Sequence, residues 1–149
     1  MKIALAVSDE SREELARLLT EKGIEIDDSA PLVLSERSRY PGHITLRDAA
    51  GEKAHLAVGS IVYLESFRHS VTIHAADGDY TSTEPLYQLQ SQLDPACFVR
   101  VSNSVIIARD KVRQIRPTFS MKFVLKLEGG ALVDVTRSYY TQFKELFGI

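Results

Sequence analysis

The chain has 149 residues, a formal net charge of −2, 44% apolar residues and 26% charged residues, which is typical of one globular domain with at most a small addition. It holds no apolar run of the roughly 18 residues that a membrane-spanning helix needs, and the N-terminus turns acidic after Val7, so we expect neither a membrane span nor a signal peptide. The charge is uneven, because residues 1–40 hold six Lys/Arg against nine Asp/Glu, whereas residues 41–149 hold twelve against eleven.

Residues 1–38 are expected to form a small β-α-β-like unit. The pattern predicts a strand over 2–8, a helix that is capped by Asp9 or Ser11 and runs to about Lys22, and short apolar runs at 24–26 and 32–34. Such a unit is too short to bury a core of its own, so we expect it to serve docking, dimerisation or regulation. The turn-rich run 35–42 is the best candidate linker.

The first 26 residues look like the start of a response-regulator receiver. A receiver needs a phosphoacceptor Asp at the end of a later strand, where it coordinates Mg²⁺. The corresponding run ends at Ser35 and offers no Asp, so we expect no complete receiver and no phosphoacceptor function.

From His43 onward the pattern changes to short strands separated by turns. Two helices interrupt them, one over 83–93 with a Thr83 cap and a stripe of Leu86, Leu89 and Leu93, and one over 138–149. The sequence therefore predicts a mainly β domain with few helices over 43–149. Its expected strands are 44–47, 54–58, 61–66, 71–75, 80–82, 98–101, 105–108, 112–116, 122–127 and 132–135.

Enzyme chemistry is not indicated by any local motif. The four histidines show no metal-ligand spacing, and His74 is expected on a strand facing solvent. The single cysteine, Cys97, fits a reducing cytoplasm and is expected to be a small buried side chain. Glycine-rich phosphate loops and nucleophile elbows are absent from the sequence, so we expect no catalysis, no metal and no cofactor.

Four segments in a fixed order carry a resemblance to a known family. They are "IVYLES" at 61–66, the L-x-x-L helix at 86–89, "FVRVSNSVII" at 98–107 and "VTRSYY" at 135–140. In this order and spacing, residues 55–147 resemble the LytTR DNA-binding domain of bacterial transcription regulators. The resemblance implies a fold of about ten mostly antiparallel strands, which contacts adjacent major grooves of DNA through loops and without a recognition helix.

The resemblance also implies which loops face the DNA. Matched residue by residue, they offer His69 beside Arg68, Asn103 flanked by Ser102 and Ser104, and Arg137 followed by Ser138. Independently of the family, Asn pairs with adenine and Arg with guanine through two hydrogen bonds each, and hydroxyls suit phosphate oxygens. Further cations are available to neutralise phosphates, namely Arg100, Arg109, Lys111, Arg113 and Arg116.

Each of these residues also has a purely structural interpretation. Asn103 fits a turn position with positive φ, and Arg137 fits a strand-end cap or a pair with Asp134. His69 fits a solvated loop, and Arg100 fits a structural ion pair. Arg109 and Lys111 taken singly fit solvated charges. The family commonly has His where this chain has Ser102, and Asn where it has Ala108.

The sequence thus predicts a cytoplasmic, sequence-specific regulator of transcription that binds double-stranded DNA. Family operators are often paired repeats, so a homodimer on DNA is expected. The alternative is a β-rich protein-interaction module that keeps the fold without DNA binding, and the near-neutral charge of residues 41–149 favours it.

Overall fold

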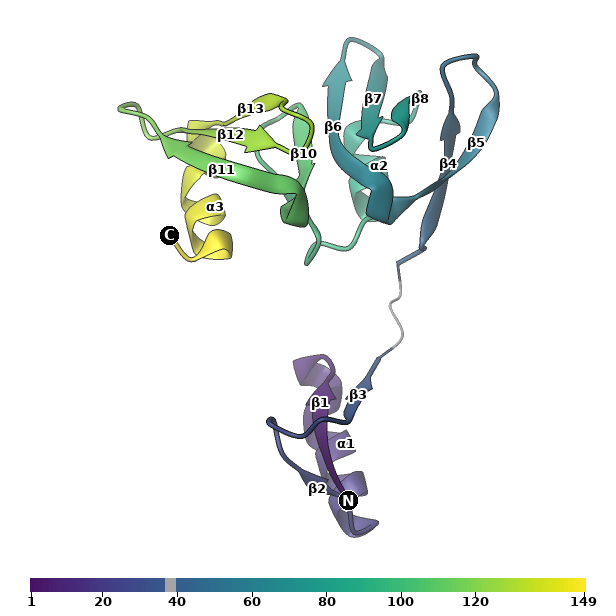
Figure 1. The fold of residues 1–149 in the computed structure, drawn as a ribbon, viewed down its shortest axis with the longest axis vertical. Helices are drawn as coiled ribbons and strands as arrows, with labels where there is room; N and C mark the ends of the chain where they lie inside the picture. Colours follow the sequence, from purple (N-terminus) through teal and green to yellow (C-terminus); the bar gives the residue numbers. More distant parts are fainter. Residues whose placement is uncertain (37–39) are drawn as a thin grey trace. The chain divides into compact units, whose positions relative to one another are not determined.

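The computed structural model describes residues 1–36 and 40–149. The chain divides into two compact units, Met1–Arg39 and Tyr40–Ile149 (Figure 1). Residues 37–39, which belong to the predicted linker 35–42 and partly to the predicted unit 1–38, lie outside the described residues. None of the described helices is long and apolar enough to cross a membrane.

The N-terminal unit is a three-stranded parallel sheet with one helix. Its elements are β1 (Lys2–Ala6), α1 (Asp9–Glu21), β2 (Glu25–Ile26) and β3 (Val33–Ser35), and the strand order is β2-β1-β3. The predicted elements are confirmed within two or three residues, but Ser8 is the N-cap of the helix instead of Asp9 or Ser11. Ile3 and Leu5 of β1 are the buried apolar residues of this unit among those described.

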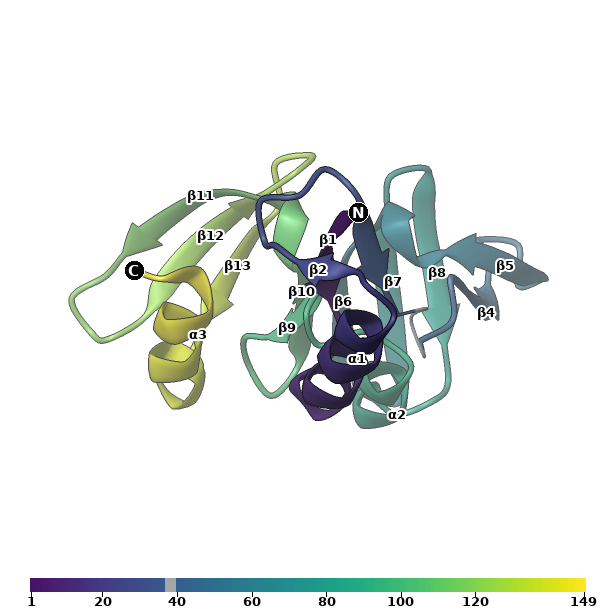
Figure 2. The same ribbon diagram turned by 90° about the horizontal axis from the view of Figure 1, so that it is seen from below.

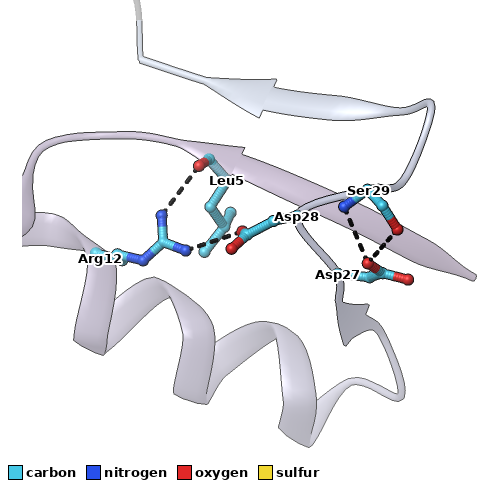
Figure 3. A network of polar contacts seen from close by, with 5 residues as sticks. All are labelled: Leu5, Arg12, Asp27, Asp28 and Ser29. Atoms are coloured by element: carbon cyan, nitrogen blue, oxygen red, sulfur yellow. Dashed lines mark hydrogen bonds and ion pairs between the residues drawn. The ribbon is translucent and has the colours of Figure 1, made fainter.

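Polar contacts hold this small unit together where its core is thin (Figure 3). Arg12 of α1 donates from Nη1 to the carbonyl of Leu5 over 3.0 Å and from Nη2 to Asp28 over 3.1 Å. Asp27 accepts from the backbone and the hydroxyl of Ser29 at 2.9 and 2.7 Å, which lowers the pKa of its carboxyl below the ordinary value. The bonds of Arg12 tie the helix to β1 and to the β2–β3 connection, and the bonds between Asp27 and Ser29 hold that connection in shape.

The C-terminal unit begins with a seven-stranded antiparallel sheet and α2 (Leu86–Ser91). The strand order is β5-β4-β8-β7-β6-β10-β9, and β6 pairs with both β7 and β10. A buried cluster of Ile, Leu and Val from these strands packs against Leu86, Leu89 and Leu93, which confirms the predicted stripe. The strands are β4 (His43–Arg47), β5 (Lys53–Ala57), β6 (Ile61–Phe67), β7 (Ser70–Ala75), β8 (Gly78–Ser82), β9 (Phe98–Arg100) and β10 (Val105–Ala108).

A second, smaller sheet completes this unit (Figure 1). It consists of β11 (Val112–Pro117), β12 (Phe123–Leu127) and β13 (Leu132–Val135), and α3 (Tyr140–Phe147) packs on it. Phe143 is 1% exposed and lies against Phe123 and Phe147, with ring centroids 5.3 and 4.3 Å away. The ten strands of the Tyr40–Ile149 unit and the mainly β class agree with the sequence prediction.

Two local predictions, the Thr83 cap and the burial of Cys97, are wrong. The helix expected from a Thr83 cap begins at Leu86 with Pro85 as its N-cap, because the residue before a proline is disfavoured in the helical region and Glu84 therefore cannot start the helix. The C-terminal helix expected over 138–149 is confirmed within two residues, since α3 begins at Tyr140 after a 3-10 turn over Arg137–Tyr139. Cys97 is exposed, since it lies in the connection before β9 and not on the strand itself.

Phe143→Ala should lower the free energy of unfolding by about 3–5 kcal/mol, because the cavity left between the rings of Phe123 and Phe147 cannot collapse fully. Phe119→Ala is the matched control, since Phe119 is fully exposed and its truncation should change stability by less than about 0.5 kcal/mol. Urea denaturation followed by circular dichroism measures both. Equal losses in the two variants would contradict this packing.

Candidate nucleic-acid interface

Two of the three predicted contact loops lie next to each other. The second loop (Val101–Ser104) joins β9 to β10, and the third loop (Thr136–Tyr139) joins β13 to α3. The backbone N–H of Thr136 donates to the carbonyl of Val101 over 3.0 Å and ties the two loops together. They border an open hollow of about 610 Å³, and the predicted site residues that line it are Ser102, Asn103, Ser104, Arg137 and Ser138.

Arg100 of β9 holds the second loop in shape. Its Nε donates to the carbonyl of Ser102 over 2.7 Å and its Nη2 donates to the carbonyl of Asn103. Its Nη1 donates to Oε1 of Gln90 in α2 over 2.8 Å. Arg100 therefore has a structural role, although its partners are backbone carbonyls and an amide and not the ion pair that the alternative interpretation named.

The two serines of the second loop differ in exposure. Ser102 is buried at 8% exposure, and its hydroxyl accepts from the backbone N–H of Ser104 over 3.2 Å. Ser104 is exposed, and its carbonyl accepts from the N–H of Ser66 over 2.8 Å, which ties the loop to β6. Ser102 thus shapes the loop, whereas Ser104 faces outward.

Tyr139 connects the two loops through a side chain that the sequence analysis did not single out. Its hydroxyl donates to Oδ1 of Asn103 over 3.2 Å. This bond fixes the orientation of the amide plane while the Asn103 amide nitrogen and a second lone pair on Oδ1 remain available. The separation of 36 residues along the chain explains why no local pattern revealed the contact.

The side chains of Asn103 and Arg137 are available for binding. Asn103 is exposed, and its φ is not positive, so the interpretation as a left-handed turn residue is wrong. Arg137 is exposed and makes no ion pair with Asp134, although both line the hollow. The interpretation of Arg137 as a partner of Asp134 is therefore wrong as well.

The first loop is the tight connection between β6 and β7. Phe67 pairs with Ser70, so Arg68 and His69 form the tip, and Arg68 adopts a left-handed φ of 58°. Both side chains are exposed, and they border a separate hollow of about 420 Å³ with Thr83 and Glu84. Since Glu65 of β6 pairs with Val105 of β10, the first and second loops lie at the same end of these strands.

Arg109 and Lys111 lie away from the three loops. They follow the end of β10 opposite the second loop, at a distance of about 20 Å along the strand from Asn103. Arg109 donates to the carbonyl of Leu146 at the end of α3 and stacks on Phe147. Lys111 bonds to Glu128 over 3.2 Å, and this bond, followed by that of Arg113, holds the pKa of Glu128 below its ordinary value.

Acidic side chains also border the hollow. Glu65 and Asp134 line it together with Lys122 and Arg137. Oε1 of Glu65 accepts from Nε2 of His74 over 2.8 Å, while Nδ1 of His74 lies 2.9 Å from Oδ1 of Asp79. The His74 side chain is 22% exposed and stacks on Tyr63, so the prediction that it faces solvent is wrong.

Among the residues that the structure describes, no three His, Cys, Asp or Glu side chains come together as a metal site. The loops instead present an amide, a guanidinium, an imidazole and hydroxyls on rigid supports. Those groups are suited to hydrogen bonding with base edges and phosphates.

Comparisons with known proteins agree with this chemistry. The chain is 29% identical over 90 residues to the transcriptional regulatory protein LytR of Staphylococcus aureus strain MW2, covering 60% of this chain and 37% of that protein. It is 24% identical over 119 residues to the sensory transduction protein LytT of Bacillus subtilis strain 168, covering 79% and 49%. The chain thus spans about half or less of the length of these relatives.

A solved LytTr DNA-binding domain from Bacillus cereus shares the fold. It superimposes with a TM-score of 0.68 at 24% identity, and the match covers 73% of this chain and 99% of that one. The model of the LytTr DNA-binding domain family matches residues 52–148, which include all three loops and both sheets except β4. The chain therefore belongs to the family of LytTr DNA-binding domains, a family defined by DNA binding and not by catalysis.

Proposed function

We propose that this protein regulates transcription by reading a double-stranded DNA sequence with His69, Asn103 and Arg137. The proposal rests on one observation above all. All three side chains are exposed: Asn103 and Arg137 lie on the adjoining second and third loops, and His69 lies on the first loop at the same end of the strands. Among the described residues, Asn103 Oδ1 accepts one hydrogen bond from Tyr139, while the Asn103 amide nitrogen and the polar groups of His69 and Arg137 make none. Groups left unpaired on a rigid surface are ready to pair with base edges.

The chemistry of each loop assigns it a task. Arg137 pairs with the O6 and N7 acceptors of guanine, and Asn103 pairs with N6 and N7 of adenine. His69 donates to or accepts from a base edge or a phosphate. Arg68, Ser104 and Ser138 are exposed beside them and contact phosphate or sugar oxygens, which set the register.

The remaining predicted contacts take supporting roles in this proposal. Arg100 and Ser102 position the second loop, since their polar groups already bond within it. Arg109 and Lys111 stabilise the α3 end and the β11 side of the smaller sheet. They add long-range positive charge without touching the bases.

The carboxylates in the hollow favour base reading over simple phosphate binding. Glu65 and Asp134 would repel a phosphate that entered the space between the second and third loops. The same carboxylates accept hydrogen bonds from the amino groups of cytosine or adenine. The hollow therefore suits the floor of a major groove better than the DNA backbone.

The wider biological setting is part of the same proposal. The protein acts in the cytoplasm, and two copies bind paired repeats of the operator. Residues 1–38 form a separate unit that serves docking, dimerisation or regulation. The small buried apolar set of this unit, Ile3 and Leu5, supports a role that depends on a partner.

The experiment that tests the function is selection of bound duplexes from a random pool, followed by fluorescence anisotropy at rising salt. The proposal predicts one enriched motif and an affinity that falls with salt, with a slope of about −0.9 per phosphate contact. If the protein binds no duplex even at low salt, it is better explained as a protein-interaction module. The near-neutral charge of residues 41–149 is consistent with that alternative.

Arg137→Ala should weaken binding to the selected sequence and relax the preference at one base pair, by about 1–3 kcal/mol in discrimination. Arg109→Ala is the matched control. Arg109 is also exposed, but it donates to the carbonyl of Leu146 and stacks on the ring of Phe147. This variant should leave the preference unchanged. Competition titrations with single-base variants of the operator measure both, and an unchanged preference in Arg137→Ala would refute its role as a base reader.

Tyr139→Phe should reduce affinity for the operator about threefold to tenfold, because the Asn103 amide loses the hydroxyl that orients it. Tyr139→Phe should also weaken the preference for the base that Asn103 reads, and Asn103→Ala should weaken the same preference. Tyr140→Phe is the control, since the Tyr140 ring stacks on Phe123 while its hydroxyl bonds to no described residue. If both tyrosine variants bind alike, the positioning role of Tyr139 is excluded.

A further inference from the structure

The connection between β11 and β12 exposes apolar side chains that the three loops do not use. We call residues 118–121 the hairpin tip; it extends outward from one end of the smaller sheet (Figure 2). Phe119 is fully exposed and Met121 is 48% exposed. Single exposed apolar residues are ordinary, but a phenylalanine and a methionine at the end of one hairpin form a small exposed apolar patch.

The hairpin tip is a built structure. The backbone N–H and the hydroxyl of Thr118 both donate to the carbonyl of Lys122, at 2.9 and 3.1 Å, and close the loop. Met121 holds a left-handed φ of 55°, which is unusual for a long side chain and carries a conformational cost. Such strain is typical of positions where the side chain direction matters for function.

The hairpin tip lies at the same edge as the proposed DNA contacts. Phe123 pairs with Val135, so the residue before β12 and the residues after β13 are neighbours. Lys122 accordingly lines the hollow together with Asn103 and Arg137. Arg116 and Lys122 are exposed on the two sides of the hairpin tip, and no acid occurs from Lys111 to Leu127.

We propose that the hairpin tip is a fourth DNA contact, which places Phe119 in the minor groove while the three loops occupy major grooves. This inference rests on the proposed DNA binding and extends it to a region without base-reading amides or guanidinium groups at its end. The minor groove has apolar sugar walls and a negative potential that is strongest over A·T pairs. Phe119 matches the apolar sugar walls, and the flanking Arg116 and Lys122 match the negative potential. In minor-groove binding proteins, apolar side chains such as Phe commonly insert between two base pairs and unstack them.

The test uses the full chain and a duplex of the selected operator in which 2-aminopurine replaces one adenine at successive steps between the major-groove contacts. Wild type should raise 2-aminopurine fluorescence at one step, because wedging reduces stacking there. Phe119→Ala should abolish that rise and weaken binding about tenfold, because the complex loses the burial of one large apolar side chain. Phe119→Leu, which keeps an apolar side chain, should retain most of both signals.

Tyr87→Ala is the matched control, since Tyr87 is 66% exposed and lines a separate hollow with Tyr40, Gln90 and Pro95. It should bind and wedge like wild type. If wild type binds the operator but Phe119→Ala binds equally well with unchanged fluorescence, the inference is wrong while the proposed function stands. A Phe119→Ala effect confined to joint occupancy of paired sites, with single-site binding intact, would also overturn it and assign the hairpin tip to a protein contact. A wild-type chain that binds no duplex overturns both proposals.

Discussion

The hydrogen bonds from Arg100 to the backbone of the second loop are the constraint on which the proposed interface depends. A guanidinium presents a planar fork of donors, and here the fork spans the carbonyls of Ser102 and Asn103 while another nitrogen reaches Gln90. Three consecutive polar residues would otherwise form a loose turn between two strands. Because the side chain starts from β9 and ends on α2, the loop inherits the rigidity of the larger sheet.

Rigidity in one loop is useful only if the other loops keep their places relative to it. The Thr136–Val101 bond and the Tyr139–Asn103 bond connect the second loop to the third, and the Ser66–Ser104 bond connects it to β6, which leads to the first. The third loop is anchored in turn by β13 and by Phe143 of α3, which both belong to the buried apolar cluster of the smaller sheet. Two cores with separate sets of apolar residues therefore support one surface.

Local patterns carried most of the fold. Alternating apolar residues and glycine turns predicted all ten strands of residues 43–149, and helical spacing predicted the Leu86, Leu89 and Leu93 stripe. The candidate site was predicted only as a set of residues, through a family resemblance. Which of them point outward depends on contacts distant in sequence: Ser102 is turned inward, and Arg109 reaches Leu146. The left-handed residue of the loops is Arg68 and not Asn103, because backbone closure between β6 and β7 decides it.

The carboxylates explain how a chain of net charge −2 is compatible with DNA binding. A surface that depends on phosphate neutralisation needs a large excess of cations, and it binds all sequences similarly. Here Glu65 is held in place by His74, and Asp134 faces the same hollow, so part of the cationic attraction is cancelled where bases would enter. Weak general attraction leaves the hydrogen bonds of a few oriented side chains as the larger share of the binding free energy. On the proposed mode of binding, such a surface would lose affinity for arbitrary DNA and gain in the ratio between its operator and other sequences.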